Sequence, residues 1–401
     1  MGAAGDVKTP ESLLTVASVF TRLGCLSFGG PVAHLGSLHA ELVLRRRWVD
    51  EGEFADLVAL CQFLPGPASS QLVFALGMTR RGLAGALVAS LCFTLPSLVL
   101  MVAFAAGVTS LGALQHAGWL HGLKLAAVAV VAQAVWSMGQ KLTPDRARLS
   151  MALAATAVVL AVPHAFTQVL VIALGGLVGW RVFRSTAMPT VAAAPARAPL
   201  AATAALVLWA VALVGLPVLV EATGARTLAQ FTAFFRSGSL VFGGGHVVLP
   251  LLRAEVVPTG WLSDDQFLAG YAAAQALPGP LFTFAGYLGA AMTTDLPWWL
   301  NGAWCALAIF LPAWLLIGGA LPFWARLRAR PSAQAMLLGA NAAVVGVLLA
   351  ALYDPVFVSA VTAPRDVAAA VVGFGLLVGW RAPPALVVIG FAALGQWVLP
   401  L

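Results

Sequence analysis

The stretch CQFLPGPASSQ, residues 61–71, interrupts a long apolar segment with Pro65, Gly66 and Pro67 and has a glutamine on either side of the break. Proline removes a backbone donor and blocks the helical ladder. Inside lipid, an irregular backbone is tolerated only where it is packed in protein or lines a polar cavity. The stretch therefore predicts a site built on a broken helix, if the chain lies in a membrane.

Composition places the chain in a membrane. Of its 401 residues, 61% are hydrophobic and 9% are charged, and the mean hydropathy is +0.94, far above that of soluble domains. No ten-residue alternation typical of a β-barrel occurs, so the sequence predicts an all-α integral membrane protein. The expected helical segments lie near residues 13–42, 54–78, 83–107, 117–139, 149–163, 165–183, 200–220, 227–252, 267–292, 296–322, 334–353, 366–381 and 385–400.

Several classes of function are disfavoured. The formal charge of +7 comes from Lys and Arg in short loops, which indicates positive-inside bias rather than nucleic-acid binding. The cysteines lack C-x-x-C spacing, so neither a metal nor a cofactor is expected. No H-E-x-x-H, G-x-S-x-G or Walker A motif is present, which argues against an enzyme or an ATP-driven pump. The N-terminus lacks a cleavable leader pattern and is expected to be mature as written.

The distribution of basic residues bears on topology. If every segment crosses once, the Arg45–Arg47 cluster lies on the non-cytoplasmic face. If the first two segments of each half are re-entrant hairpins, more Lys and Arg lie inside, so the positive-inside rule favours re-entry. Half-helices of about ten residues reach ~15 Å, roughly the bilayer midplane.

The chain contains an internal repeat. RLGCLSFGGPVAHLGSLHAEL from residue 22 aligns with RSGSLVFGGGHVVLPLLRAEV from residue 236, and QFLPGP aligns with QALPGP after a one-residue gap. We expect a first membrane repeat at 1–183, a linker at 184–226 that carries one transmembrane helix at 200–220, and a second repeat at 227–401. One extra helix between the two units inverts the second, so the fold class is two inverted-topology repeats with re-entrant broken-helix hairpins.

At these residues the sequence resembles the chromate ion transporter family. The similar motifs are FGGPVAH, RRRWVDEGEF and QFLPGPASSQL in the first half, and FGGGHVVLPLL and QALPGPLFTFAGYLG in the second. The resemblance spans nearly the whole chain and implies a secondary transporter that exports chromate, driven by the proton gradient or the membrane potential. Sulfate or another oxyanion, an anion channel on the same scaffold, and a homodimer are left open.

A tetrahedral dianion suits the helix starts that follow these breaks. Free N–H groups and the helix dipole favour an anion there, and four such ends would supply on the order of +2 elementary charges. Hydroxyl and amide side chains beside the breaks can complete the site, or can cap helices and satisfy backbone groups instead. The predicted substrate-binding set is Arg22, Gly29, Gly30, Gln62, Pro65, Gly66, Ser69, Ser70, Arg236, Gly243, Gly244, His246, Gln275, Gly279 and Thr283.

Charged residues near the breaks have two interpretations each. Arg22 and Arg236 occupy equivalent positions about two turns before the Gly-Gly pairs, where they can attract the anion or can pair with Glu41 and Glu255. His34, Glu41 and Glu255 are the candidates for proton coupling, and a packing role for the histidine is equally open.

Overall fold

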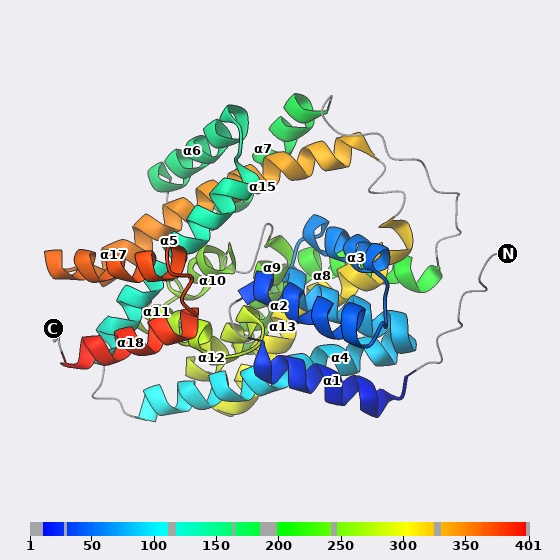
Figure 1. Cartoon of the computed structure of the whole chain (residues 1–401), viewed down its shortest axis with the longest axis horizontal. Coiled ribbons are helices and arrows are strands. Elements are labelled where there is room, and N and C mark those ends of the chain that lie inside the picture. Colours follow the sequence, from blue (N-terminus) through cyan, green and yellow to red (C-terminus); the bar gives the residue numbers. More distant parts are fainter. Residues whose placement is uncertain are drawn as a thin grey trace.

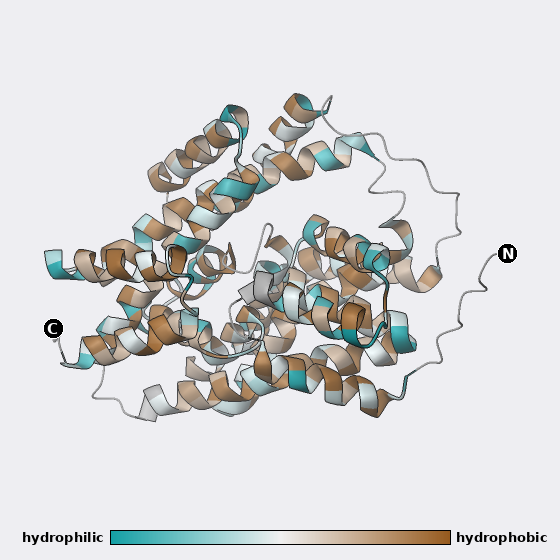
Figure 2. Cartoon of the chain, in the orientation of Figure 1, coloured by the Kyte–Doolittle hydropathy of each residue, from teal (hydrophilic) through white to brown (hydrophobic). Residues whose placement is uncertain are grey.

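The computed structural model describes residues 11–27, 30–110, 118–162, 165–184, 199–241, 247–324 and 330–397. Within these ranges every regular element is a helix and no β-strand occurs, so the all-α prediction is confirmed. Figure 1 shows the helices, and Figure 2 shows that apolar residues run along most of them.

The first half contains helices of very different lengths. They are α1 (Leu13–Leu26), α2 (Gly30–His39) with a π-helical continuation (Ala40–Arg45), α3 (Glu51–Phe63), α4 (Ala68–Ser110), α5 (Gly118–Leu142), α6 (Arg146–Ala161) and α7 (Ala165–Phe183). Side-chain oxygens of Ser12, Asp50 and Asp145 cap the first turns of α1, α3 and α6. The long α4 breaks at Arg81 and Gly82, whose backbone angles are not helical, close to the boundary that the sequence predicts between two segments.

Helix α8 (Leu200–Thr223) leads into the second half. The following elements are α9 (Arg226–Leu240), α10 (Val248–Val256), α11 (Asp264–Ala276), a 3-10 turn (Leu281–Thr283), α12 (Phe284–Ala291), α13 (Trp298–Ala320), a 3-10 turn (Leu321–Phe323), α15 (Pro331–Ala351), a π-helical turn (Leu352–Phe357), α16 (Val358–Ala360), α17 (Pro364–Val378) and α18 (Pro384–Trp397). Ser263 and Gln266 form a capping box that begins α11.

Helix lengths separate full spans from shorter pieces. Among the described residues, the helices long and apolar enough to cross a membrane are Ala68–Gly107, Gly118–Leu142, Leu200–Thr223, Trp298–Phe323 and Pro331–Ala360. The apolar window of α8 has no buried residues, which suits a helix that faces lipid. Helices α1, α2 and α3 are too short to span alone, in agreement with half-helices. Whether they re-enter stays a prediction.

Helices of each half pack against helices of the other half. Helix α5 packs against α17 and α18 of the second half, whereas α15 packs against α6 and α7 of the first. These crossings are close because glycines face backbone: a side chain at Gly122 would collide with Phe391 O, and one at Gly339 would collide with Gly175 O. A reciprocal exchange of this kind is what a two-fold relation between the halves produces.

Candidate functional site

Two backbone hydrogen bonds join the broken helices of the two halves. The Gly66 N–H donates to Val241 O over 2.7 Å, and the Gly279 N–H donates to Ser27 O over 2.8 Å. Val241 and Ser27 follow the last residues of α9 and α1 at equivalent positions of the repeat. Each Pro-Gly-Pro loop therefore contacts the broken helix of the other half, and we call this arrangement the crossing.

Glycine is required at both loops of the crossing. Gly66 has φ +126° and Gly279 has φ +100°, in the region that other residues rarely adopt. A Cβ atom at Gly66 would lie 2.7 Å from Gln71 Nε2, and one at Gly279 would lie 2.7 Å from Ser97 Cβ. The expected breaks at Pro65–Pro67 and Pro278–Pro280 are confirmed, since α3 ends at Phe63 and α11 ends at Ala276.

Hydroxyl groups lie beside the crossing, but the two sides differ. Thr283 donates to Pro280 O over 2.9 Å, and its Oγ1 lies 2.7 Å from Ser97 Oγ. The equivalent of Thr283 is Ser70, whose buried hydroxyl has no partner among the described residues, and the equivalent of Ser97 is Ala313. The unpartnered Ser70 hydroxyl is free to donate to a bound ligand.

Gln71 and His34 complete the buried polar groups near the crossing. Gln71 is fully buried and donates from Nε2 to Pro65 O over 2.7 Å, while its Oε1 has no partner. His34 Nε2 lies 3.2 Å from Ser27 O, and its ring lies edge-on to Phe93. Sequence reasoning missed Gln71 as a site residue, although the residue closes the quoted stretch, and it also missed Ser27 and Ser97.

The first turn of α4 carries unsatisfied donors. The Gln71 N–H donates to Pro67 O, so the N–H groups of the three preceding residues, Ala68, Ser69 and Ser70, have no acceptor within the helix. Ser69 and Ser70 are buried. Together with the Ser70 hydroxyl, these groups form an electropositive surface that suits an oxyanion.

The other predicted residues have varied environments. Gln62 is exposed, whereas Gln275 is partly buried and its Nε2 has no partner. Gly30 is the first residue of α2. Gly29, Gly243, Gly244 and His246 lie outside the described residues.

Both predicted arginines form ion pairs with the glutamate of their own half. Arg22 Nη2 lies 2.5 Å from Glu41, which also contacts Arg45 and Arg46. Arg236 donates to both oxygens of Glu255, over 2.8 and 2.5 Å. This matches the ion-pair alternative that the sequence left open. Three guanidinium groups surround Glu41, an arrangement that suits a structural cluster of ion pairs more than a proton carrier.

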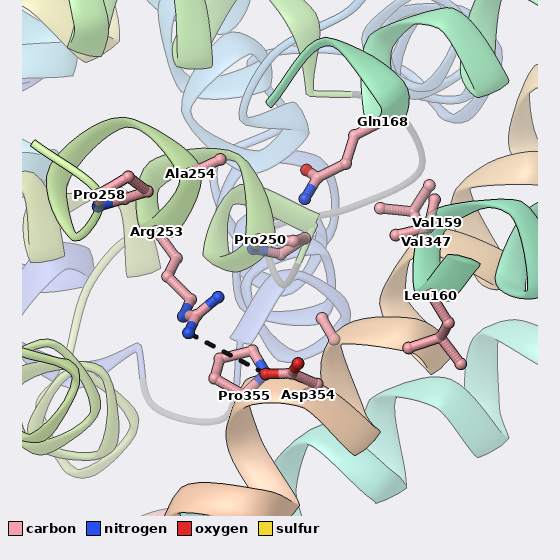
Figure 3. A pocket seen from close by; sticks show the side chains of 11 residues that line it. Val159, Leu160, Gln168, Pro250, Arg253, Ala254, Pro258, Val347, Asp354 and Pro355 are labelled. Carbon is pink, nitrogen blue, oxygen red and sulfur yellow. Dashed lines mark ion pairs between the residues drawn. The ribbon is translucent and has the colours of Figure 1, made fainter. Parts of the chain in front are cut away.

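In each half a second pair of polar side chains joins the segment after the Gly-Gly motif to the start of the next helix. His39 Nε2 lies 2.9 Å from Glu51, and at the equivalent positions Arg253 donates to Asp264 over 2.7 and 3.0 Å. Arg253 also lines a cavity of ≈ 310 Å³. Figure 3 shows Arg253 and Gln168 extending into this cavity from α10 and α7, with Asp354 4.0 Å from the guanidinium.

One ion pair and one buried hydrogen bond link α5 to the second half. Lys124 Nζ lies 3.0 Å from Asp265 at the start of α11. His121 Nε2 lies 3.0 Å from Asp366 in α17, and these two side chains are only 3% and 1% exposed. Asp366 also accepts hydrogen bonds from Thr362 and Ala363. The sequence showed no signal for the His121–Asp366 pair, because its members are far apart along the chain.

The part of the chain that the structure describes holds no group of three or more His, Cys, Asp or Glu side chains that could bind a metal ion. The four cysteines are free, and Cys61 and Cys305 are buried. The polar groups named at the crossing are backbone amides, hydroxyls, the Gln71 carboxamide and the His34 imidazole, and this set without a carboxylate suits an anion better than a cation.

Several long apolar helices, together with helices that are broken where the two halves meet, define a multi-pass membrane protein. Comparison with known sequences agrees. The chain belongs to the chromate transporter family, whose family model matches residues 14–180 and 228–396. This is a family of transport proteins rather than enzymes.

Three relatives are similar over most of the chain. The chain is 31% identical to the chromate transport protein of Pseudomonas aeruginosa over 98% of this chain and 94% of that protein. It is 28% identical to the chromate transport protein of Cupriavidus metallidurans, over 100% and 97% of the two chains. It is also 28% identical to a probable chromate transport protein of Synechococcus elongatus, over 85% and 84%. No solved structure matches the chain.

Proposed function

We propose that this protein exports chromate across the bacterial inner membrane as a secondary active transporter, driven by the proton gradient or the membrane potential. The observation that carries the proposal is the crossing, in which Gly66 and Gly279 each bond to the broken helix of the other half. Transporters built from inverted repeats bind substrate where such broken helices meet. The odd helix α8 between the halves supports inverted topology.

The substrate contacts follow from the donors at the crossing. The dianion lies against the first turn of α4, where the N–H groups of Ser69 and Ser70 have no acceptor within the helix and the Ser70 hydroxyl has no partner among the described residues. The helix dipole adds roughly +0.5 elementary charge there. Thr283 ends the equivalent 3-10 turn before α12, and its hydroxyl already donates to Pro280 O, so the second half offers no matching free hydroxyl in this state.

The test is oxyanion flux in proteoliposomes with the pH gradient and the voltage set independently. We expect chromate flux that responds to one of these gradients, and Ser70→Ala should raise the half-saturation concentration about tenfold, since a hydrogen bond to a charged group is worth about 1.5–3 kcal/mol. Ser18→Ala on α1 is the matched control, because Ser18 Oγ bonds only to Thr15 O.

Three outcomes would contradict the proposal. Preference for sulfate over chromate would reassign the substrate. Conductance without coupling to protons would indicate a channel. Absence of any flux would reject transport of either anion. None of these outcomes depends on the family resemblance.

A further inference from the structure

The reciprocal packing of the halves allows each contact to be compared with its equivalent. Gly122 of α5 meets Phe391 of α18 as Gly339 of α15 meets Gly175 of α7, so α5 corresponds to α15 and α18 to α7. The sequence repeat pairs α3 with α11. A fully symmetric molecule would then pack α3 on α15 and α7 in the way that α11 packs on α5 and α18.

The structure departs from this symmetry at α3. Helix α11 packs against both α5 and α18. Among the described residues, α3 packs extensively against α4 but not to a comparable extent against α7 or α15. A cavity of ≈ 550 Å³ lies there instead, with walls that include Phe63 at the end of α3 and Leu64 after it, Ile172 and Leu177 in α7, and Met336 and Leu337 in α15.

The walls of this cavity are almost entirely apolar. Such walls give a dianion no donors, so the cavity is a poor conduit for substrate. They are instead surfaces of the kind that pack against each other, as the equivalent surfaces of α11, α5 and α18 do. The occupant that fits the cavity is the end of α3 itself, after a movement toward α7 and α15.

An ion pair joins α11 to α5, and the equivalent positions of α3 and α15 carry none. Lys124 of α5 lies 3.0 Å from Asp265 of α11, and the Lys124 side chain is 13% exposed. The equivalent positions on the other side are Asn341 and Gly52, which cannot form an ion pair. The Asn341 Oδ1 atom is buried without a partner.

We propose that α11 against α5 and α18 is a closed gate latched by the Lys124–Asp265 ion pair, and that α3 against α7 and α15 is its open counterpart. The two gates exchange during transport, because opening the latch and closing α3 into the cavity convert this state into its symmetry-related partner. This inference rests on the proposed function. It adds Lys124 and Asp265 as gating residues that do not touch the substrate.

Two matched cysteine pairs test the exchange. In a background without Cys25, Cys61, Cys92 and Cys305, one protein carries Lys124→Cys with Asp265→Cys and the other carries Gly52→Cys with Asn341→Cys. A protease site is inserted within residues 185–198, between the two cysteines of each pair. After cleavage, the two fragments stay together on a non-reducing gel only if the cysteines are cross-linked. Membrane vesicles are treated with an oxidant, with and without chromate.

We expect both pairs to cross-link in part, and each cross-link to block transport until it is reduced. Adding Lys124→Gln to the protein with Gly52→Cys and Asn341→Cys should increase cross-linking between residues 52 and 341 about threefold to fivefold. Loss of the Lys124–Asp265 ion pair favours the state in which α3 packs against α7 and α15. Arg148→Gln, which removes an ion pair with Asp145 outside both gates, should leave cross-linking unchanged.

The outcomes separate the inference from the proposed function. If Gly52 and Asn341 never cross-link while chromate flux is normal, the exchange of gates is wrong and the function stands. If both pairs cross-link but no chromate moves, the gates stand and the assigned substrate is wrong. An unchanged second cross-link in the Lys124→Gln protein would reject the ion pair as a latch.

Discussion

Arg236 donates through Nε and Nη2 to the two carboxylate oxygens of Glu255, and Arg22 meets Glu41 at the equivalent positions of the first half. In each half the pair ties the helix before the Gly-Gly motif to the helical segment after it. A hairpin whose backbone ladder is interrupted depends on side-chain contacts of this kind to keep its shape. The arginines therefore stabilise the frame in which the crossing is held.

The Arg236–Glu255 pair makes a first prediction. Arg236→Gln leaves the partly buried Glu255 without its charged partner, and we expect a loss of about 1–3 kcal/mol in unfolding free energy. Arg236→Gln with Glu255→Gln should recover most of this loss and the chromate flux, measured by thermal unfolding in detergent and by vesicle uptake. If stability recovers in the double variant but flux does not, Arg236 contacts the anion, as the sequence first suggested.

The Pro-Gly-Pro loops make a second prediction. Gly66→Ala and Gly279→Ala place a Cβ atom on a backbone with positive φ and within 2.7 Å of a neighbouring atom, so we expect each to lower the unfolding free energy by about 1–3 kcal/mol. Gly36→Ala is the control, because nothing lies within 4 Å of its Cβ and α2 favours alanine. Equal melting temperatures for all three variants would show that the loops are not constrained.

The breaks could be predicted from the sequence because proline and glycine act locally. The deletion of a backbone donor at Pro65 and the repeat of the motif at Pro278 suffice to predict interrupted helices. The bonds that cross between halves could not be predicted in this way. These bonds depend on packing between the halves, in which α5 contacts α17 and α18 and α15 contacts α6 and α7. The close approach of these helices requires glycine at positions such as Gly122 and Gly339. In the sequence these two residues do not differ from other glycines within helices.

The same limit applies to the site residues. The sequence predicts that Arg22 and Arg236 are functional charges within apolar segments. Whether each arginine contacts an anion or a glutamate depends on three-dimensional contacts that the sequence does not contain. Ser97 was missed because its partner Thr283 is distant along the chain. Equivalent positions in the repeat need not carry equivalent chemistry, as Ala313 in place of Ser97 demonstrates.

This difference between Ser97 and Ala313 makes a third prediction. Ser97→Ala removes the 2.7 Å contact with Thr283 and should cost about 0.5–1.5 kcal/mol of unfolding free energy. Ala313→Ser should supply the missing partner of the Ser70 hydroxyl and raise stability by a similar amount. Because that bond occupies Ser70, we also expect Ala313→Ser to weaken chromate binding in equilibrium assays. A variant that is more stable and binds chromate normally would remove Ser70 from the proposed site.

The His121–Asp366 pair makes the last prediction. Both side chains are almost fully buried, and Asp366 also accepts from the Thr362 and Ala363 N–H groups that begin α17. Removal of His121 leaves the buried Asp366 without one of its hydrogen-bond partners, which typically costs about 1–3 kcal/mol. We therefore expect His121→Ala to lower the melting temperature strongly.

The variant His121→Gln tests whether His121 stabilises the protein through its hydrogen bond to Asp366 or through the volume of its side chain. The glutamine amide can donate to Asp366 from a position close to that of His121 Nε2, and the unpartnered Nδ1 needs no replacement. Because Asp366 stays hydrogen-bonded, His121→Gln should retain most of the stability that His121→Ala loses, measured by thermal unfolding of the two purified proteins in the same detergent. Equal losses in both variants would mean that the packing of the imidazole ring, and not its hydrogen bond to Asp366, stabilises this contact.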